Sequence, residues 1–403
     1  MIEVIKKDKH PHLYAIKIAV YSRLFPSFIK SGIKIPSITP NKKKGSLKAF
    51  YLSAFSNGNA GDTLLPTVLK DLIGNALGIK KWTCEHVHKL VTLDDVAKYN
   101  KNDMIIIGGG GLFLKDTNPN QNSGWQWNCS IEMLTKIQKP LIAFAIGYNR
   151  FREQEDFDPI FYKHINAFVK KAAFVGLRNH GSIRAVKKYL NEPALKEKIV
   201  FQPCMTTLIS YIYPNLINYR KKKDIIAFNC AFDRKELRSL RDSSLCSIAK
   251  VAKELSKIAK IRYYSHMESD NIALDYFNKF NVDYELFELK KAKQIIQAYA
   301  EPSLVIGMRG HSQLIPFGCN TPILSIISHD KMAWFLEDIN HTELGVDILN
   351  PDFETILNEK AIYVYRNKEK YIEELSIEQN NLWATTQANL KQIQSLVGND
   401  ERT

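Results

Sequence analysis

The residues best suited to chemistry stand in the sequence Met-Arg-Gly-His-Ser, directly after an apolar run at Leu304–Ile306. Arg309 and His311 are separated there by a single glycine, and the pattern predicts that a helix begins at this point. A fixed cation and an imidazole at a helix N-terminus would bind an anion, because that end of a helix has partial positive charge. Lys331 follows the next apolar run and could direct an ammonium group at the same anion.

A second arginine stands at a similar boundary. Arg178 and Ser182 lie where a strand expected at Ala173–Gly176 gives way to a helix expected at Ser182–Tyr189. A guanidinium group offers a planar fork to phosphate or carboxylate, and a hydroxyl could add a further bond. Ligands of open α/β sheets gather at the carboxyl ends of the strands, so Arg178 is a candidate binding residue.

Two glycine-rich segments also follow strand-like runs. Gly58-Asn59-Ala60-Gly61-Asp62 lies between a strand expected at Leu47–Phe55 and a helix expected at Thr63–Leu77. Its glycines would leave backbone N–H groups uncovered at a helix N-terminus, which suits an anion or a sugar. Asp62 either caps this helix or acts on a substrate hydroxyl, and the sequence leaves both possibilities open.

The other segment runs from Gly108 to Gly111 after a strand expected at Asp103–Ile107. It lets a ligand approach the backbone of Gly109 and Gly110, or it simply forms a tight turn. It has neither the spacing of a dinucleotide-binding fingerprint nor the Lys-Ser/Thr pair of a phosphate-binding loop.

The elements that must position these residues alternate between short apolar runs and helical patterns, which predicts parallel sheets wrapped by helices. The alternation restarts at Asp224 after a polar stretch, Asn218–Lys223, and it ends in a long amphipathic pattern at Glu369–Val397 that could brace the first domain. We therefore predict an α/β protein with two Rossmann-like domains facing each other across a cleft. The expected parts are a basic arm at 1–45, an acceptor-side domain at 46–217, a donor-side domain at 222–365 and a C-terminal helix at 366–403.

The arm holds much of the positive charge. Residues 1–50 contain eleven Lys or Arg and two acidic residues, a net +9 out of +14 for the chain. The spacing of the apolar residues in Leu13–Phe25 predicts a helix, which either binds anionic lipid or packs on the first domain. A nucleic-acid partner is not expected, because the arm contains no recognisable binding module.

The overall composition, with 45% hydrophobic and 24% charged residues, is that of a globular protein. The six cysteines include no C-x-x-C pair, so we expect reduced and mostly buried thiols and no metal site. No signal peptide or membrane span is apparent. We expect a cytoplasmic protein, and the basic arm is a candidate for peripheral contact with the inner face of the membrane.

Taken in order, these motifs resemble the polysaccharide pyruvyl transferase family over most of residues 47 to 340. The matching features are Gly58-Asn59-Ala60-Gly61-Asp62, the glycine run at 108–111, Arg178 with Ser182, Arg309 with His311, and Lys331 in an Asp-Lys pair. One departure is Phe201-Gln202-Pro203-Cys204, where the family commonly has an Asp-Pro pair, so a role of that aspartate does not carry over.

The resemblance implies the domain arrangement of GT-B glycosyltransferases and phosphoenolpyruvate as donor, held by Arg178, Arg309, His311 and Lys331. Pyruvate would pass to a sugar of a polysaccharide or its lipid-linked precursor as a cyclic ketal, with no cofactor. His311 is the expected acid or base, and Asp62 is the other catalytic candidate. The alternative is a GT-B glycosyltransferase that binds the diphosphate of a nucleotide sugar through Arg309 and Lys331.

Overall fold

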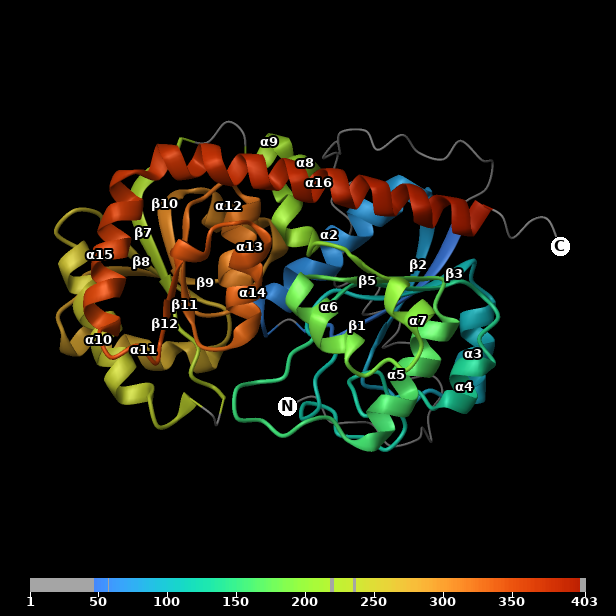
Figure 1. The fold of residues 1–403 in the computed structure, drawn as a ribbon. Coiled ribbons are helices and arrows are strands. Elements are labelled where there is room, and N and C mark those ends of the chain that lie inside the picture. The colour runs from blue at the N-terminus through green and yellow to red at the C-terminus, as the bar shows by residue number, and fades with distance from the viewer. Residues whose placement is uncertain (1–46, 57, 218–220, 235–236, 399–403) are drawn as a thin grey trace.

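The computed structural model describes residues 47–56, 58–217, 221–234 and 237–398. The arm predicted at 1–45 lies outside this part of the chain, and so do residues 218–220, half of the polar stretch expected to be a linker. The described residues form two parallel six-stranded sheets with helices packed around them (Figure 1).

The first sheet has the strand order β2-β1-β3-β4-β5-β6, and all its pairs are parallel. Its direction of winding reverses between β1 and β3, so the ligand crevice of such a sheet is expected beyond the carboxyl ends of these two strands. The strands are β1 Leu47–Ser53, β2 Ile79–His86, β3 Met104–Gly108, β4 Leu141–Ile146, β5 Phe174–Leu177 and β6 Ile199–Phe201. The helices are α2 Ala60–Leu77, α3 Leu93–Asn100, α4 Ile131–Thr135, α5 Pro159–Lys171, α6 His180–Lys187 and α7 Pro193–Glu197.

The second sheet repeats this plan with the order β12-β11-β10-β7-β8-β9, and its winding reverses between β7 and β10. Its strands are β7 Lys223–Asn229, β8 Lys260–Ser265, β9 Tyr284–Glu288, β10 Pro302–Gly307, β11 Ile323–Ile327 and β12 Gly345–Asp347. Its helices are α10 Arg241–Leu255, α11 Ile272–Lys279, α12 Ala292–Ala300, α13 His311–Gly318, α14 Asp330–Asp338 and α15 Phe353–Arg366. Short helical segments at Met205–Leu208, α8 Ile209–Ile212 and α9 Pro214–Ile217 connect the two halves.

The C-terminal helix α16, Lys368–Gly398, crosses from the second half to the first along one side of the molecule (Figure 1). Near its end, Gln394 donates a hydrogen bond of 2.7 Å to the carbonyl oxygen of Ala76 in α2, and Asn389 donates one of 2.8 Å to that of Phe201. At its middle, Gln379 bonds the carbonyl of Phe317 in α13. The predicted bracing helix is therefore confirmed.

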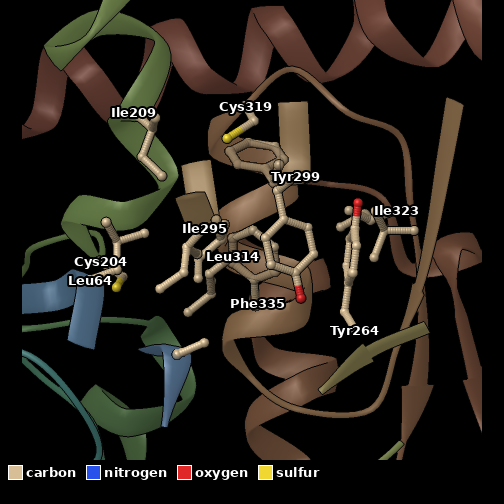
Figure 2. Close-up of a cluster of buried hydrophobic side chains, with 14 of the residues drawn as sticks. Leu64, Cys204, Ile209, Tyr264, Ile295, Tyr299, Leu314, Cys319, Ile323 and Phe335 are labelled. Atoms are coloured by element: carbon tan, nitrogen blue, oxygen red, sulfur yellow. The ribbon is translucent and has the colours of Figure 1, made fainter. Parts of the chain in front are cut away.

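One apolar cluster runs without interruption through both halves. Figure 2 shows Leu64 of α2, Cys204 and Ile209 on one side of it, and Ile295 and Leu314 of the second half on the other. Domains in contact through a polar surface move readily, whereas a shared apolar core fixes their relative orientation. Five of the six cysteines are buried and all six are free thiols, as predicted.

Candidate functional site

The two places where the winding reverses face each other. α2 begins after β1 and α13 begins after β10, and the side chain of His311 lies directly over Gly61. A Cβ atom on Gly61 would be 2.0 Å from His311 Nδ1. The N–H of Ala60 also donates a hydrogen bond of 3.2 Å to the carbonyl oxygen of His266 in the second half. The two halves thus meet at the helix N-termini that the sequence singled out.

Asp62 occupies the first turn of α2, close to three cations. Burial raises the pKa of its carboxyl to about 6, and Arg309, Lys331 and Arg178 oppose that rise. The interpretation of Asp62 as the helix cap is wrong, because α2 starts earlier and Asn59 is the N-cap, accepting a bond of 2.9 Å from Gly61 N–H. Asp62 is therefore available for another role.

His311 is held neutral by its surroundings. Burial, followed by the charges of Arg178 and Lys331, lowers its pKa to about 3. Its Nε2 atom is buried and has no hydrogen-bond partner among the described residues. In this state the imidazole does not carry a proton near neutral pH, but it retains a basic nitrogen.

Arg178 and Lys331 complete this group. The guanidinium of Arg178 lies over Gly147, where a Cβ atom would be 2.1 Å from Arg178 Nε. Burial lowers the pKa of Lys331 well below its usual range, and Arg178, Arg234 and Arg309 lower it further. Like charges confined together are costly, so this group favours a bound anion.

Arg309 forms ion pairs with two carboxylates, those of Asp233 and Asp270. Its Nε donates to both oxygens of Asp270 at 2.9 and 3.1 Å, and its Nη2 donates to Asp270 at 2.5 Å and to Asp233 at 2.9 Å. Asp270 is fully buried and follows β8. Although burial lowers it, the pKa of Arg309 is raised by these two carboxylates, so the guanidinium stays charged. Its Nη1 atom has no hydrogen bond to the described residues and is the part left for a ligand.

Sequence reasoning missed Asp270 and three further participants. Asp233 and Arg234 follow β7, at the strand end where ligands gather, and that position was the available signal. The guanidinium of Arg234 lies 3.7 Å from the ring centroid of Phe151, and Lys331 Nζ lies 5.4 Å from it. The Phe151 ring also stacks on His329 at 4.8 Å. Phe151 therefore covers one side of the cationic group, and nothing in its own sequence context indicates this.

Both glycine segments have structural roles in the fold. The N–H groups of Ala60 and Gly61 are already bonded to His266 and Asn59, so they are not an open anion site. Gly109 and Gly110 have φ angles of 72° and 86°, and the carbonyl of Gly110 accepts a bond of 2.9 Å from Gly147 N–H. These two glycines form the turn that follows β3.

Two further candidates lie at the edges of the site. Gly58 is exposed in the loop that precedes α2. The hydroxyl of Ser182 is buried and accepts a hydrogen bond of 2.9 Å from Tyr148 N–H, so it holds the loop after β4.

A narrow cavity lies among these groups. Arg178, Cys204, Gly310, Gln313 and Lys331 are among the residues that line it. Its volume of about 20 Å³ accommodates roughly one water molecule. A ligand larger than a water molecule fits this cavity only if lining side chains such as Lys331 move.

The model of the polysaccharide pyruvyl transferase family matches residues 2–330. The chain belongs to this family. The resemblance seen in the sequence is thereby confirmed for most of the chain. No curated protein matches the sequence.

Solved structures show that this pyruvyl transferase family member has the GT-B fold. A putative UDP-N-acetylglucosamine 2-epimerase from Listeria monocytogenes superposes with a TM-score of 0.52 at 12% identity, covering 86% of this chain and 97% of its own. The Neisseria meningitidis UDP-GlcNAc 2-epimerase bound to UDP-GlcNAc gives 0.52 at 10% identity, covering 88% and 100%. An Anabaena protein in complex with UDP and glucose gives 0.50 at 10% identity, covering 87% and 100%. The predicted fold class is confirmed, while identities this low show nothing about ligands.

None of the helices in the described part of this family member combines the length and the apolar character needed to cross a bilayer.

Proposed function

We propose that this protein transfers pyruvate from phosphoenolpyruvate to a sugar and forms a pyruvate ketal. The observation that supports it is the group of Arg178, Arg234, Arg309 and Lys331 at the junction of the two halves, in a chain of the polysaccharide pyruvyl transferase family. Phosphoenolpyruvate is a small trianion near neutral pH. Arginine and lysine would bind its phosphate and carboxylate and would stabilise the departing phosphate.

Asp62 and His311 have pKa values shifted in opposite directions, which separates their roles. A carboxyl with a pKa of about 6 is a suitable proton donor, and an imidazole with a pKa of about 3 is a neutral base. We assign protonation of the donor methylene carbon to Asp62. We assign to His311 the acceptance of the proton from the sugar hydroxyl that attacks the adjacent carbon.

The step balances without a cofactor. Protonation of the methylene carbon gives a methyl group and makes the neighbouring carbon electrophilic, and the first hydroxyl adds to it. The C–O bond to phosphate then breaks, with the proton held by His311 leaving on the phosphate. A second hydroxyl of the sugar adds and its proton returns to Asp62, so the products are the ketal and inorganic phosphate.

The test is a comparison of ligands and products. Phosphoenolpyruvate should raise the melting temperature, since a ligand stabilises the state it binds, and UDP should not. Incubation with phosphoenolpyruvate and free or lipid-linked glycans should then yield a pyruvylated sugar in the mass spectrum, together with phosphate. Stabilisation by UDP alone would favour the nucleotide-sugar alternative and contradict this proposal.

A further inference from the structure

A second and much larger cavity opens beside the cationic group. Its volume is about 510 Å³, within the range of about 300 to 1,000 Å³ that small-molecule sites occupy. The loop after β4, the helices α5 and α6, and the start of α14 form its walls. Its lining includes Tyr148, Phe151, Asp156, Tyr162, Tyr189 and Trp334.

The polar groups in this cavity converge on one carboxylate. Asp156 accepts hydrogen bonds from the hydroxyls of Tyr189 and Tyr162, the latter at 3.2 Å. The hydroxyls of Tyr148 and Tyr189 are 2.9 Å apart. Asp156 is nevertheless exposed, and Tyr162 is 40% exposed, so both can meet a ligand.

Aromatic rings next to hydroxyls and a carboxylate suit a sugar. The C–H face of a pyranose packs on an aromatic ring, while its hydroxyls need donors and acceptors at the edge of that ring. Trp334 supplies a partly exposed indole in the same wall, with its ring 6.5 Å from that of Tyr148. The charged side chains of the lining balance, with Arg150, Arg152 and Lys188 against Glu153, Asp156 and Asp330, so the cavity has no net charge that would select an anion.

The large cavity lies next to the candidate donor site. Phe151 lines the cavity, and the same ring lies against Arg234 and Lys331. Asp330 also lines the cavity and directly precedes Lys331 at the start of α14. The Phe151 side chain, on the loop after β4, therefore separates a ligand in the large cavity from the cationic group.

We propose that this second cavity is the acceptor subsite and that it binds an uncharged pyranoside. Tyr162 and Trp334 contact the face of the ring and Asp156 accepts hydrogen bonds from its hydroxyls. The inference rests on the proposed function for its role in transfer, but the sugar site is testable without the donor.

The experiment is saturation-transfer NMR on the full chain without donor. The probes are the methyl pyranosides of glucose, galactose, mannose and their 2-acetamido derivatives, because this method detects weak binding. We compare wild type with Tyr162→Ala and Asp156→Asn, and with Tyr363→Ala as a matched control, since Tyr363 is an exposed tyrosine of α15. Stabilisation by phosphoenolpyruvate is measured on every variant.

We expect at least one pyranoside to bind wild type and Tyr363→Ala equally. Tyr162→Ala and Asp156→Asn should weaken its binding at least fivefold while leaving stabilisation by phosphoenolpyruvate unchanged. The inference is overturned if no probe binds, or if the probe binds Tyr162→Ala as well as wild type. If the sugar binds in the expected pattern but phosphoenolpyruvate does not stabilise any variant, phosphoenolpyruvate is not the donor. The proposed sugar site would still be supported in that case.

Discussion

His311 and Gly61 come from opposite halves of the molecule, and the imidazole occupies the space that a side chain at position 61 would need. This contact sets the distance between the N-termini of α2 and α13. A glycine is therefore needed at position 61 because His311, about 250 positions further along the chain, packs against it.

Replacing Gly61 by alanine should separate these two helices. The added methyl group would be 2.0 Å from His311 Nδ1, and such overpacking costs about 1 to 3 kcal/mol. We expect a lower melting temperature and weaker binding of phosphoenolpyruvate. Gly58→Ala is the control, because a Cβ atom there meets only Ser56 Oγ at 3.6 Å. Equal melting temperatures for the two variants would show that His311 moves aside freely.

The ion pair between Asp270 and Arg309 should be essential to stability. Asp270→Ala leaves a mostly buried guanidinium with one remaining carboxylate, and losing one partner of a buried pair costs about 3 to 5 kcal/mol. Chemical denaturation measures this loss. Asp275→Ala on the surface of α11 is the control and should change stability by less than about 0.5 kcal/mol. A loss of similar size in both variants would contradict the role of the pair.

The donor should bind less well when Arg309 becomes lysine. An ammonium group keeps the charge but cannot bond Asp270 through two nitrogens while presenting a third to the ligand. We expect the affinity for phosphoenolpyruvate to fall at least tenfold, about 1.4 kcal/mol, in calorimetry. Arg366→Lys on the exposed side of α15 should not change the affinity. Unchanged affinity in Arg309→Lys would remove this residue from the donor site.

Binding of the donor should draw protons into the site. Burial and neighbouring cations hold the pKa of Lys331 well below its usual range and that of His311 at about 3. A trianion favours the protonated ammonium, so the pKa of Lys331 rises when it binds, whereas the pKa of His311 starts too low for its imidazole to become protonated at pH 8. Calorimetry at pH 8 in buffers of different ionisation enthalpy should show proton uptake, and Lys331→Ala should reduce it. Proton release on binding would contradict this account of the site.

Apolar runs, including those at Leu141–Ile146, Ile261–Tyr264 and Ile323–Ile326, predict the inner strands of both sheets, whereas the edge strands could not be predicted. The four strands that the patterns missed, β2, β6, β9 and β12, are the two edges of each sheet. Edge strands are covered less completely, and β9 contains three exposed residues out of five. Three of these edge strands, β2, β9 and β12, show no continuous apolar run, which is the signal that identified the inner strands, and β6 has only the three residues Ile199–Phe201.

Contacts between site residues that are far apart along the chain could not be predicted from the sequence. Arg178, Arg309, His311 and Lys331 were singled out because each lies shortly after a buried strand. The carboxylates that hold Arg309 were not, because a pairing between positions 270 and 309 has no local pattern. The pKa of His311 was also beyond the sequence, since it depends on burial and on charges from both halves.

Asp62 and His311 should affect the pH dependence of the chemical step differently. Because Asp62 must be protonated to act, and its pKa of about 6 rises further beside a bound trianion, turnover should fall as pH increases above that raised pKa. Single-turnover rates at saturating phosphoenolpyruvate measure this without interference from ionisation of the free donor. Asp62→Asn should lower the rate about a hundredfold or more and abolish the alkaline decline.

His311→Ala should also lower the rate about a hundredfold, because the sugar hydroxyl loses its base, but the alkaline decline that belongs to Asp62 should remain. A weak external base such as imidazole should restore part of the rate in His311→Ala and none in Asp62→Asn. If saturating donor restores the full rate of His311→Ala, then His311 serves binding alone. If the decline persists in Asp62→Asn instead, the proton comes from another group, and Lys331 is the next candidate, because its lowered pKa allows it to release a proton.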